Sequence, residues 1–251
     1  MASKKVTFEG ALGESLSGRL DLPEKDMKAC ALFAHCFTCS KSLKVVGNIA
    51  KELVASKIGV LRFDFTGLGQ SEGEFANTNF SSNVDDLVAA AQFMKKETDG
   101  PGLLIGHSLG GAAVLQGSQR IPSAKGVVTI GAPSDPAHVM KHFEAHMDKI
   151  QERGEAEVML AGRKFTIKKQ LIDDLSATRM DKYIGDLDKA LLVMHSPVDD
   201  TVGIDNAAHI YKKASHPKSF ISLDKADHLL RDDQHSRYAG ALIATWAQLY
   251  I

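Results

Sequence analysis

Short, uniformly apolar runs alternate along the chain with segments in which apolar residues recur every three or four positions. The uniform runs are typical of strands buried on both faces of a sheet, and the periodic segments are typical of amphipathic helices. The expected strands are Ala29–Ala34, Val60–Phe65, Gly102–Ile105, Gly126–Ile130, Ala190–His195 and Ser219–Leu223. The expected helices lie within 46–54, 84–94, 110–118, 204–213 and 239–249. This alternation predicts a mostly parallel, twisted α/β sheet with helices on both faces.

Two parts of the chain depart from this alternation. Near the N-terminus, Val6–Glu9 and Leu16–Leu22 flank two glycines and predict a pair of antiparallel strands. Residues 132–187 separate two expected sheet strands, and they predict a polar helix near 135–152, then a hairpin and another helix. Because ligands bind at the C-terminal edge of such sheets, we expect about 134–187 to form a lid over that edge. The lid is then an insertion in a single domain that spans 1–251.

The overall composition limits the partners and the location. The chain has 251 residues, of which 44% are hydrophobic and 24% charged, and its formal net charge is −1. Because no basic surface dominates, we expect neither nucleic acid nor an anionic membrane as a partner. No apolar run approaches the roughly 18 residues of a membrane span. The first ten residues, MASKKVTFEG, lack the apolar centre of a signal peptide. We therefore expect a cytoplasmic protein.

A short motif near the middle of the chain places a serine between two glycines. Residues 106–110 read Gly-His-Ser-Leu-Gly, which fits G-x-S-x-G, between an expected strand and an expected helix. In such a turn the serine hydroxyl projects above the sheet, and the glycines avoid side-chain collisions. Ser108 is therefore a candidate nucleophile, and the amide of Leu109 is a candidate oxyanion donor at a helix N-terminus. The competing interpretation is a serine that only caps the helix.

This motif and a second one resemble the α/β-hydrolase superfamily, and the resemblance runs from about residue 15 to the C-terminus. Asp64, Gly67, Gly69 and Ser71 fit that family's D-x-x-G-x-G-x-S turn, for which the resemblance implies a structural role beside the active site. The segments RFDFTGLGQSEGEF, NFSSNVDDL and HCFTCSK are similar to the hydrolase half of bacterial proteins that join an α/β hydrolase to an OsmC-like domain. The resemblance implies the α/β-hydrolase fold, serine hydrolase activity and, in the full-length protein, an OsmC-like domain as partner.

The resemblance also assigns an acid and a base to the serine. In this fold the chain order is Ser, then Asp or Glu, then His. The segment HSPVDDTV, residues 195–202, resembles the family's H-G-x-x-D-x-x-V and places the acid at Asp199, with Asp200 as the rival. The family's histidine falls at His228, on the loop after the next strand. His235 is a weaker rival because it lies in the approach to the last helix rather than on that loop.

The segment LFAHCFTCSK, residues 32–41, holds Cys36 and Cys39 in a C-x-x-C spacing. In α/β hydrolases this position has His-Gly followed by the residue that supplies the second oxyanion amide. The resemblance therefore assigns that amide to Phe37, with Cys36 in place of the glycine. Three cysteines make a disulfide framework unexpected, and zinc would need a second ligand pair. Thiol redox chemistry at Cys36 and Cys39 remains an alternative function.

The expected lid and the serine motif supply candidate substrate contacts. Met140 and Phe143 fall at helical spacing on the lid, where they pack it down or line an apolar acyl pocket. With Phe37 and His107 they form the predicted substrate-binding set. Three lid histidines recur every fourth residue, which suits a polar face at the cleft mouth or, alternatively, a transition metal. These are His138, His142 and His146.

The predicted function is hydrolysis of a small-molecule carboxylic ester through a Ser-His-Asp triad and an acyl-enzyme, with no cofactor and no metal. Two alternatives from other classes stay open. One is a hydrolase-fold protein that binds a ligand without turnover, and the other is the thiol redox protein. The lid and an edge strand can each form a dimer surface, so a homodimer is also open.

Overall fold

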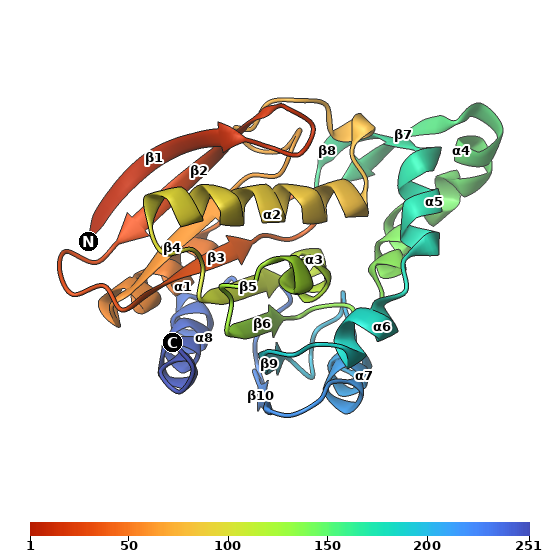
Figure 1. Ribbon diagram of the computed structural model, residues 1–251. Helices are drawn as coiled ribbons and strands as arrows, with labels where there is room; N and C mark the ends of the chain where they lie inside the picture. Colours follow the sequence, from red (N-terminus) through yellow and green to blue (C-terminus); the bar gives the residue numbers. More distant parts are fainter.

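A single eight-stranded sheet runs through the centre of the protein, whose computed structural model describes residues 1–251 (Figure 1). The strand order is β1-β2-β4-β3-β5-β6-β9-β10. The two N-terminal strands pair antiparallel, β2 is antiparallel to β4, and all other pairs are parallel. The strands are β1 (Ala2–Glu9), β2 (Ser15–Leu22), β3 (Ala29–Ala34), β4 (Ile58–Phe63), β5 (Leu103–His107), β6 (Gly126–Ile130), β9 (Ala190–His195) and β10 (Lys218–Ser222).

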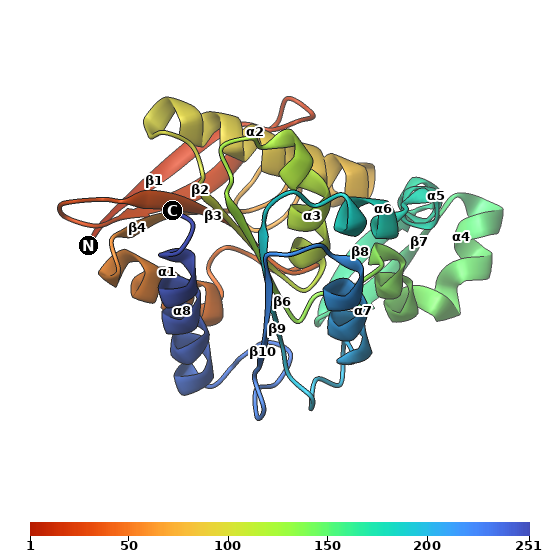
Figure 2. The ribbon, with the colours of Figure 1, turned by 60° about the horizontal axis from the view of Figure 1, so that its bottom comes forward.

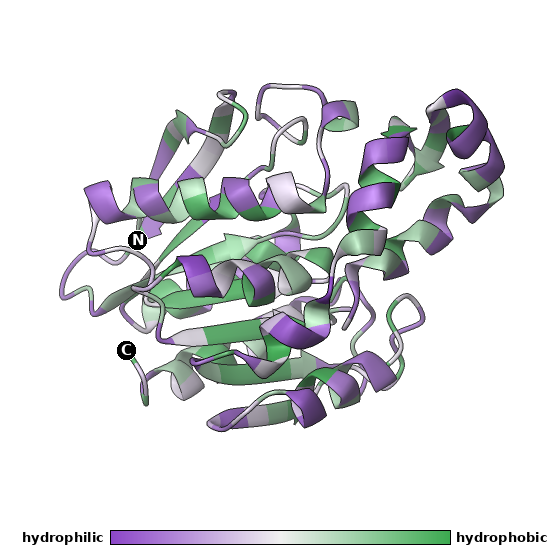
Figure 3. Ribbon diagram, turned by 45° about the vertical axis from the view of Figure 1, so that its right-hand side comes forward, coloured by the Kyte–Doolittle hydropathy of each residue, from purple (hydrophilic) through white to green (hydrophobic).

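Helices cover both faces of the sheet, as Figure 2 shows. One face packs against α1 (Lys44–Ala55) and α8 (Asp233–Ala247), which also contact each other. The other packs against α2 (Phe80–Glu97), α3 (Leu109–Gly117) and α7 (Asp205–Lys213). Apolar residues concentrate in the central strands, and hydrophilic residues occupy the outer turns of the helices (Figure 3). The α/β-hydrolase fold expected from the sequence is confirmed. None of the helices combines the length and the apolar character that a bilayer crossing needs.

The segment between β6 and β9 departs from the regular alternation, as expected, and its order is η3, α4, β7, β8, α5, α6. Strands β7 and β8 pair only with each other. The elements are η3 (Pro136–His146), α4 (Met147–Arg153), β7 (Glu155–Leu160), β8 (Arg163–Lys168), α5 (Lys169–Ala177) and α6 (Met180–Gly185). We refer to residues 132–189 as the β6–β9 insertion.

One helix of the insertion differs from the sequence prediction. In place of a continuous α-helix over 135–152, the chain forms 3₁₀ turns over Pro136–His146, with a non-helical break at Phe143, and an α-helix only from Met147. Asp135 caps the first turn by accepting from the amide of Ala137. Because the helix breaks at Phe143, apolar residues on the two sides of the break do not form one continuous helical face.

Candidate active site

Ser108 lies on a sharp turn between β5 and α3. Its φ of 54° and ψ of −125° are rare for a residue other than glycine, and such strain concentrates at functional sites. The flanking glycines allow this turn, because a Cβ on Gly106 would lie 2.2 Å from the carbonyl oxygen of Gly110. A Cβ on Gly110 would lie 2.3 Å from that of Ala34. The turn therefore presents the serine hydroxyl at the C-terminal edge of the sheet.

The structure brings Ser108, His228 and Asp199 together from three separate loops. The Nε2 atom of His228 lies 3.0 Å from the Oγ atom of Ser108, and its Nδ1 atom lies 2.7 Å from Oδ2 of Asp199. All three residues are at most 9% exposed. A serine, an imidazole and a carboxylate in this order can pass the hydroxyl proton to the imidazole while the carboxylate orients it.

Asp199 is held as an acceptor by more than the imidazole. Its Oδ1 atom accepts hydrogen bonds from the amides of Thr201, at 3.0 Å, and Val202, at 2.8 Å. Burial raises the pKa of Asp199, but the hydrogen bonds from His228 and from these two amides outweigh it. The net pKa lies below the ordinary value. Asp200 is exposed and accepts only from the Thr201 hydroxyl, so it does not contact the imidazole.

Among the two histidines considered as the base, only His228 reaches the serine. His235 lies on α8, where it lines a different surface depression together with Leu223 and Tyr238. His228 contacts both Ser108 and Asp199, whereas His235 forms no hydrogen bond with either of them.

The loop after β3 carries a disulfide between Cys36 and Cys39, with the two Cα atoms 5.3 Å apart. The sequence did not predict this bond, because an odd and small number of cysteines gave no reason to pair them. Within the loop the amide of Cys39 donates to the carbonyl of Cys36 at 3.1 Å. Both cysteines line the same cavity as Ser108, and Cys30 is the free, buried third cysteine.

A buried ion pair anchors the far end of this loop. The Nζ atom of Lys41 lies 2.5 Å from Oδ2 of Asp64, and the backbone amide of Lys41 donates to Oδ1 at 2.6 Å. The amide of Gln70 also donates to Oδ2, which ties in the glycine-rich turn. A Cβ on Gly69 would lie 2.3 Å from this carboxylate, so only glycine fits there. The D-x-x-G-x-G-x-S turn thus braces the loop that follows β3.

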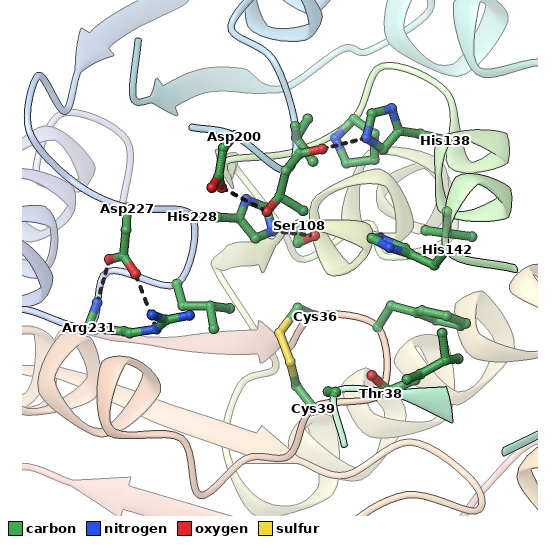
Figure 4. A pocket seen from close by; sticks show the side chains of 18 residues that line it. Cys36, Thr38, Cys39, Ser108, His138, His142, Asp200, Asp227, His228 and Arg231 are labelled. Atoms are coloured by element: carbon green, nitrogen blue, oxygen red, sulfur yellow. Dashed lines mark hydrogen bonds and ion pairs between the residues drawn. A yellow bond between two sulfur atoms is a disulfide. The ribbon is translucent and has the colours of Figure 1, made fainter. Parts of the chain in front are cut away.

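A cavity of about 290 Å³ opens above Ser108 and His228 (Figure 4). The disulfide loop forms one side and includes Phe37. The β6–β9 insertion contributes several residues to the walls, and the two loops after β9 and β10 contribute the rest. The residues from the insertion are Pro133, His138, Val139, His142, Leu160 and Ala161.

Three of the four residues expected to contact substrate lie outside the walls of this cavity. His107 and Phe143 are each 1% exposed and packed in the interior, and Met140 packs against the main core. From η3, the side chains that line the cavity are instead His138, Val139 and His142. The Nε2 atom of His138 pairs with the carbonyl of Thr201 at 2.8 Å. No group of three or more metal-ligating side chains is present, so the three histidines do not converge.

Residues 26–177 match the protein family described as serine aminopeptidase, S33. The chain belongs to the S33 family of α/β hydrolases. Its full length also aligns with 99% of the esterase domain of a Rhodothermus marinus protein, at 46% identity and a TM-score of 0.81. No protein with a curated description matches the chain.

Two more distant structures share the fold. The ferulic-acid-bound Est1E of Butyrivibrio proteoclasticus is 17% identical, covers 98% of this chain and 99% of its own, and has a TM-score of 0.81. The mouse α/β hydrolase domain-containing protein 10 is 16% identical, with coverage of 98% and 99% and a TM-score of 0.78. The family and the 46% identical relative make this S33-family chain a serine hydrolase.

Two buried histidines of the S33-family chain form hydrogen bonds with the loops that carry the proposed base and acid. His107 pairs through Nε2 with the carbonyl of His228 at 2.7 Å, and His195 pairs with the carbonyl of Val202 at the same distance. A carbonyl can only accept, so each Nε2 carries the proton. His107 therefore holds the loop of the base, and His195 holds the loop of the acid. Sequence reasoning missed this role of His195, although the residue starts the motif that revealed Asp199.

The pH dependence of stability is expected to report on His107. Burial, and then the charge of nearby His228, lower the pKa of His107 from 6.5 to about 4. Between these values the unfolded chain binds a proton that the folded chain does not. Stability is therefore complete above pH 6.5 and decreases as the pH falls, by about 2 kcal/mol between pH 7 and pH 5 from this group alone.

The measurement is urea unfolding at pH 7 and pH 5 for the wild type and for His107→Gln. Glutamine keeps a donor for the carbonyl of His228 but does not titrate. The difference in unfolding free energy between the two proteins at pH 7 gives the packing cost of the substitution. The decrease in unfolding free energy from pH 7 to pH 5 should be smaller in the variant than in the wild type. Equal losses of unfolding free energy between pH 7 and pH 5 in the two proteins would exclude protonation of His107 as a source of the pH dependence. Burial also lowers the pKa of His35 and His195, which act in the same direction and remain in both proteins.

Proposed function

We propose that this chain is a carboxylic ester hydrolase in which Ser108, His228 and Asp199 form the catalytic triad. One observation carries the proposal: an unbroken series of hydrogen-bonding contacts from Ser108 Oγ through both nitrogens of His228 to Asp199, at the floor of an open cavity. The chain order Ser, Asp, His agrees with that of the α/β-hydrolase fold. The 46% identical esterase domain supports an ester as the substrate.

In the proposed reaction His228 Nε2 takes the hydroxyl proton of Ser108 as Oγ attacks the ester carbonyl carbon. The tetrahedral intermediate collapses when His228 returns that proton to the leaving alcohol, and an acyl-enzyme remains. His228 then deprotonates a water molecule, which attacks the acyl carbonyl, and His228 returns that proton to Ser108 Oγ as the ester bond to the serine breaks and the carboxylic acid is released. Asp199 keeps the Nδ1 proton in place and stabilises the imidazolium, and its lowered pKa keeps it ionised.

The negative oxygen of the tetrahedral intermediate needs two donors, for which we propose the amides of Phe37 and Leu109. Leu109 is the first residue of α3, where the amides have no partner within the helix and the helix dipole favours negative charge. Phe37 lies on the disulfide loop and lines the cavity. Each such donor is worth about 3 kcal/mol in the transition state.

The cavity favours a small or medium-sized acyl group. About 290 Å³ lies at the lower end of the volumes of small-molecule sites. Apolar walls come from Phe37, Val139 and Leu160, and the exposed polar residues that line the cavity include His142 and Asp200. Cytoplasmic location, a homodimer and an OsmC-like partner domain stay predictions from the sequence.

The test is labelling with a fluorophosphonate, followed by peptide mapping, together with turnover of p-nitrophenyl esters from acetate to octanoate. We expect one adduct, on Ser108, and highest kcat/KM for the short and medium chains. Aminoacyl p-nitroanilides test peptidase activity in parallel. Labelling elsewhere, or no turnover of any ester, would contradict the proposal. Binding without turnover would favour the non-catalytic alternative, and activity lost on cysteine alkylation but kept in Ser108→Ala would favour thiol chemistry.

A further inference from the structure

The turn that carries Phe37 has a backbone conformation that its sequence disfavours. Residues 36–39 form a tight turn, closed by the hydrogen bond from the Cys39 amide to the Cys36 carbonyl. Thr38, at the third position of this turn, has a φ of 59°. That region favours glycine, and it is a marked outlier for a residue branched at Cβ. Additional restraints, beyond the turn's own backbone hydrogen bond, must therefore hold it in this form.

The disulfide is the first restraint. It joins the two ends of the turn, so Phe37 and Thr38 are confined between two fixed Cα atoms 5.3 Å apart. Cys36 is buried, and both cysteines line the cavity opposite Ser108, as Figure 4 shows. The chain before the turn is fixed as well, because Nδ1 of His35 pairs with the carbonyl of Cys36 at 2.9 Å.

Arg163, from the β7–β8 hairpin of the insertion, is the second restraint. Its guanidinium donates to the carbonyl of Thr38, the residue with the unfavourable φ. The same guanidinium lies over the ring of Phe165, 5.2 Å from its centroid. Phe165 contacts Phe75 at 4.9 Å between ring centroids, and Phe75 contacts Phe37 at 5.7 Å. The hairpin thus contacts the backbone of the turn directly through Arg163, and it contacts the Phe37 side chain indirectly through Phe75.

We propose that Arg163 and the Cys36–Cys39 disulfide are positioning groups for the Phe37 amide, so that the thiol–disulfide state of this pair sets the turnover rate. This inference rests on the proposed function, in which Phe37 donates to the oxyanion. Neither group contacts the reacting atoms. Both act by holding the turn, and small misplacements of a catalytic donor cost large factors in rate.

The redox step is an exchange with a dithiol. One thiolate of the dithiol attacks a sulfur of the disulfide and forms a mixed disulfide, and its second thiolate then displaces the remaining cysteine. The S–S bond of the protein breaks, the dithiol becomes a cyclic disulfide, and its two protons end on Cys36 and Cys39. Oxidation by a disulfide of the same class reverses the step.

The test measures kcat and KM for p-nitrophenyl butyrate, per active site titrated with fluorophosphonate, in four proteins. These are the oxidised wild type, the wild type reduced with dithiothreitol, Cys36→Ser/Cys39→Ser, and Arg163→Ala. Alkylation and mass spectrometry establish the state of the cysteines. We expect kcat to fall by about 10- to 100-fold in the reduced and double-serine forms and about 10-fold in Arg163→Ala, with little change in KM.

Two further readouts separate positioning from a merely structural role. Affinity for a boronic acid, which forms a tetrahedral adduct on serine, should weaken in proportion to kcat, whereas a general loss of stability would lower the titrated fraction only. Arg163→Lys, which keeps a donor, should recover part of kcat. Lys164→Ala is the matched control, because Lys164 neighbours Arg163 on β8 and its ammonium group pairs with exposed Glu157.

The outcomes distinguish this inference from the proposed function. If the oxidised wild type labels at Ser108 and turns over esters, but reduction and the double-serine variant leave kcat within about twofold, the role of the disulfide is wrong. The same result for Arg163→Ala would overturn the role of the arginine. If the fluorophosphonate labels none of these proteins at Ser108, the proposed function is wrong, and the inference that rests on it is wrong as well.

Discussion

Replacing Ser108 by alanine is expected to lower kcat for p-nitrophenyl butyrate by at least about 10⁴-fold, with KM changed little. The substitution removes the only hydroxyl that lies 3.0 Å from Nε2 of His228. Without it no acyl-enzyme forms, and the remaining rate comes from binding and the oxyanion donors. The measurement is steady-state turnover of a preparation free of host esterases, together with fluorophosphonate labelling, which should disappear.

Ser118→Ala is the matched control. Ser118 is also buried, but it lies beyond the end of α3 and its hydroxyl bonds only to the carbonyl of Leu115. It should keep wild-type kcat. A Ser108→Ala protein that folds, as judged by circular dichroism, and keeps more than about a tenth of wild-type turnover would exclude Ser108 as the nucleophile.

Asp199→Asn is expected to lower kcat by about 10³- to 10⁴-fold. Asparagine keeps the shape, but its amide cannot stabilise the imidazolium, and its NH₂ group favours the wrong tautomer of His228. The buried carboxylate also accepts from two backbone amides, so one oxygen of asparagine can still satisfy the loop. The protein should therefore fold, and the loss should appear in kcat rather than in the midpoint of urea unfolding.

Asp200→Asn is an adjacent control with the same change in charge. Asp200 is exposed at the cavity wall and makes no contact with the imidazole, so kcat should change by less than about threefold. The opposite ranking, with Asp200→Asn the more damaging substitution, would show that the acid has been assigned to the wrong residue.

The sequence was sufficient to predict the strands of the sheet and to select the three residues that the structure brings together. Uniform apolar runs marked the parallel strands because strands buried on both faces tolerate little else. Ser108, Asp199 and His228 each lie directly after or near the end of such a strand, within short motifs whose spacing reflects local backbone geometry. Because neighbouring residues determine the backbone geometry at these positions, the three residues could be predicted from the sequence alone.

Contacts between segments that are far apart in the sequence could not be predicted in this way. The bond from Arg163 to Thr38 joins residues 125 positions apart, and no local pattern around either residue indicates the other. The placement of Met140 and Phe143 outside the cavity walls has a different reason. The sequence prediction assumed one continuous α-helix, whereas η3 breaks at Phe143 and that side chain is buried in the core.

The β6–β9 insertion has a consequence for how such an enzyme can change over evolutionary time. The proposed nucleophile, acid and base come from loops at the ends of β5, β9 and β10, whereas His138, Val139, Leu160 and Ala161 all come from the insertion. Mutations in the insertion can therefore alter the pocket without moving the reacting groups. Arg163 sets a limit on that freedom, because a hairpin exchanged between relatives must still supply a donor to Thr38. New substrate preferences should thus arise more readily at residues 138–160 than at position 163.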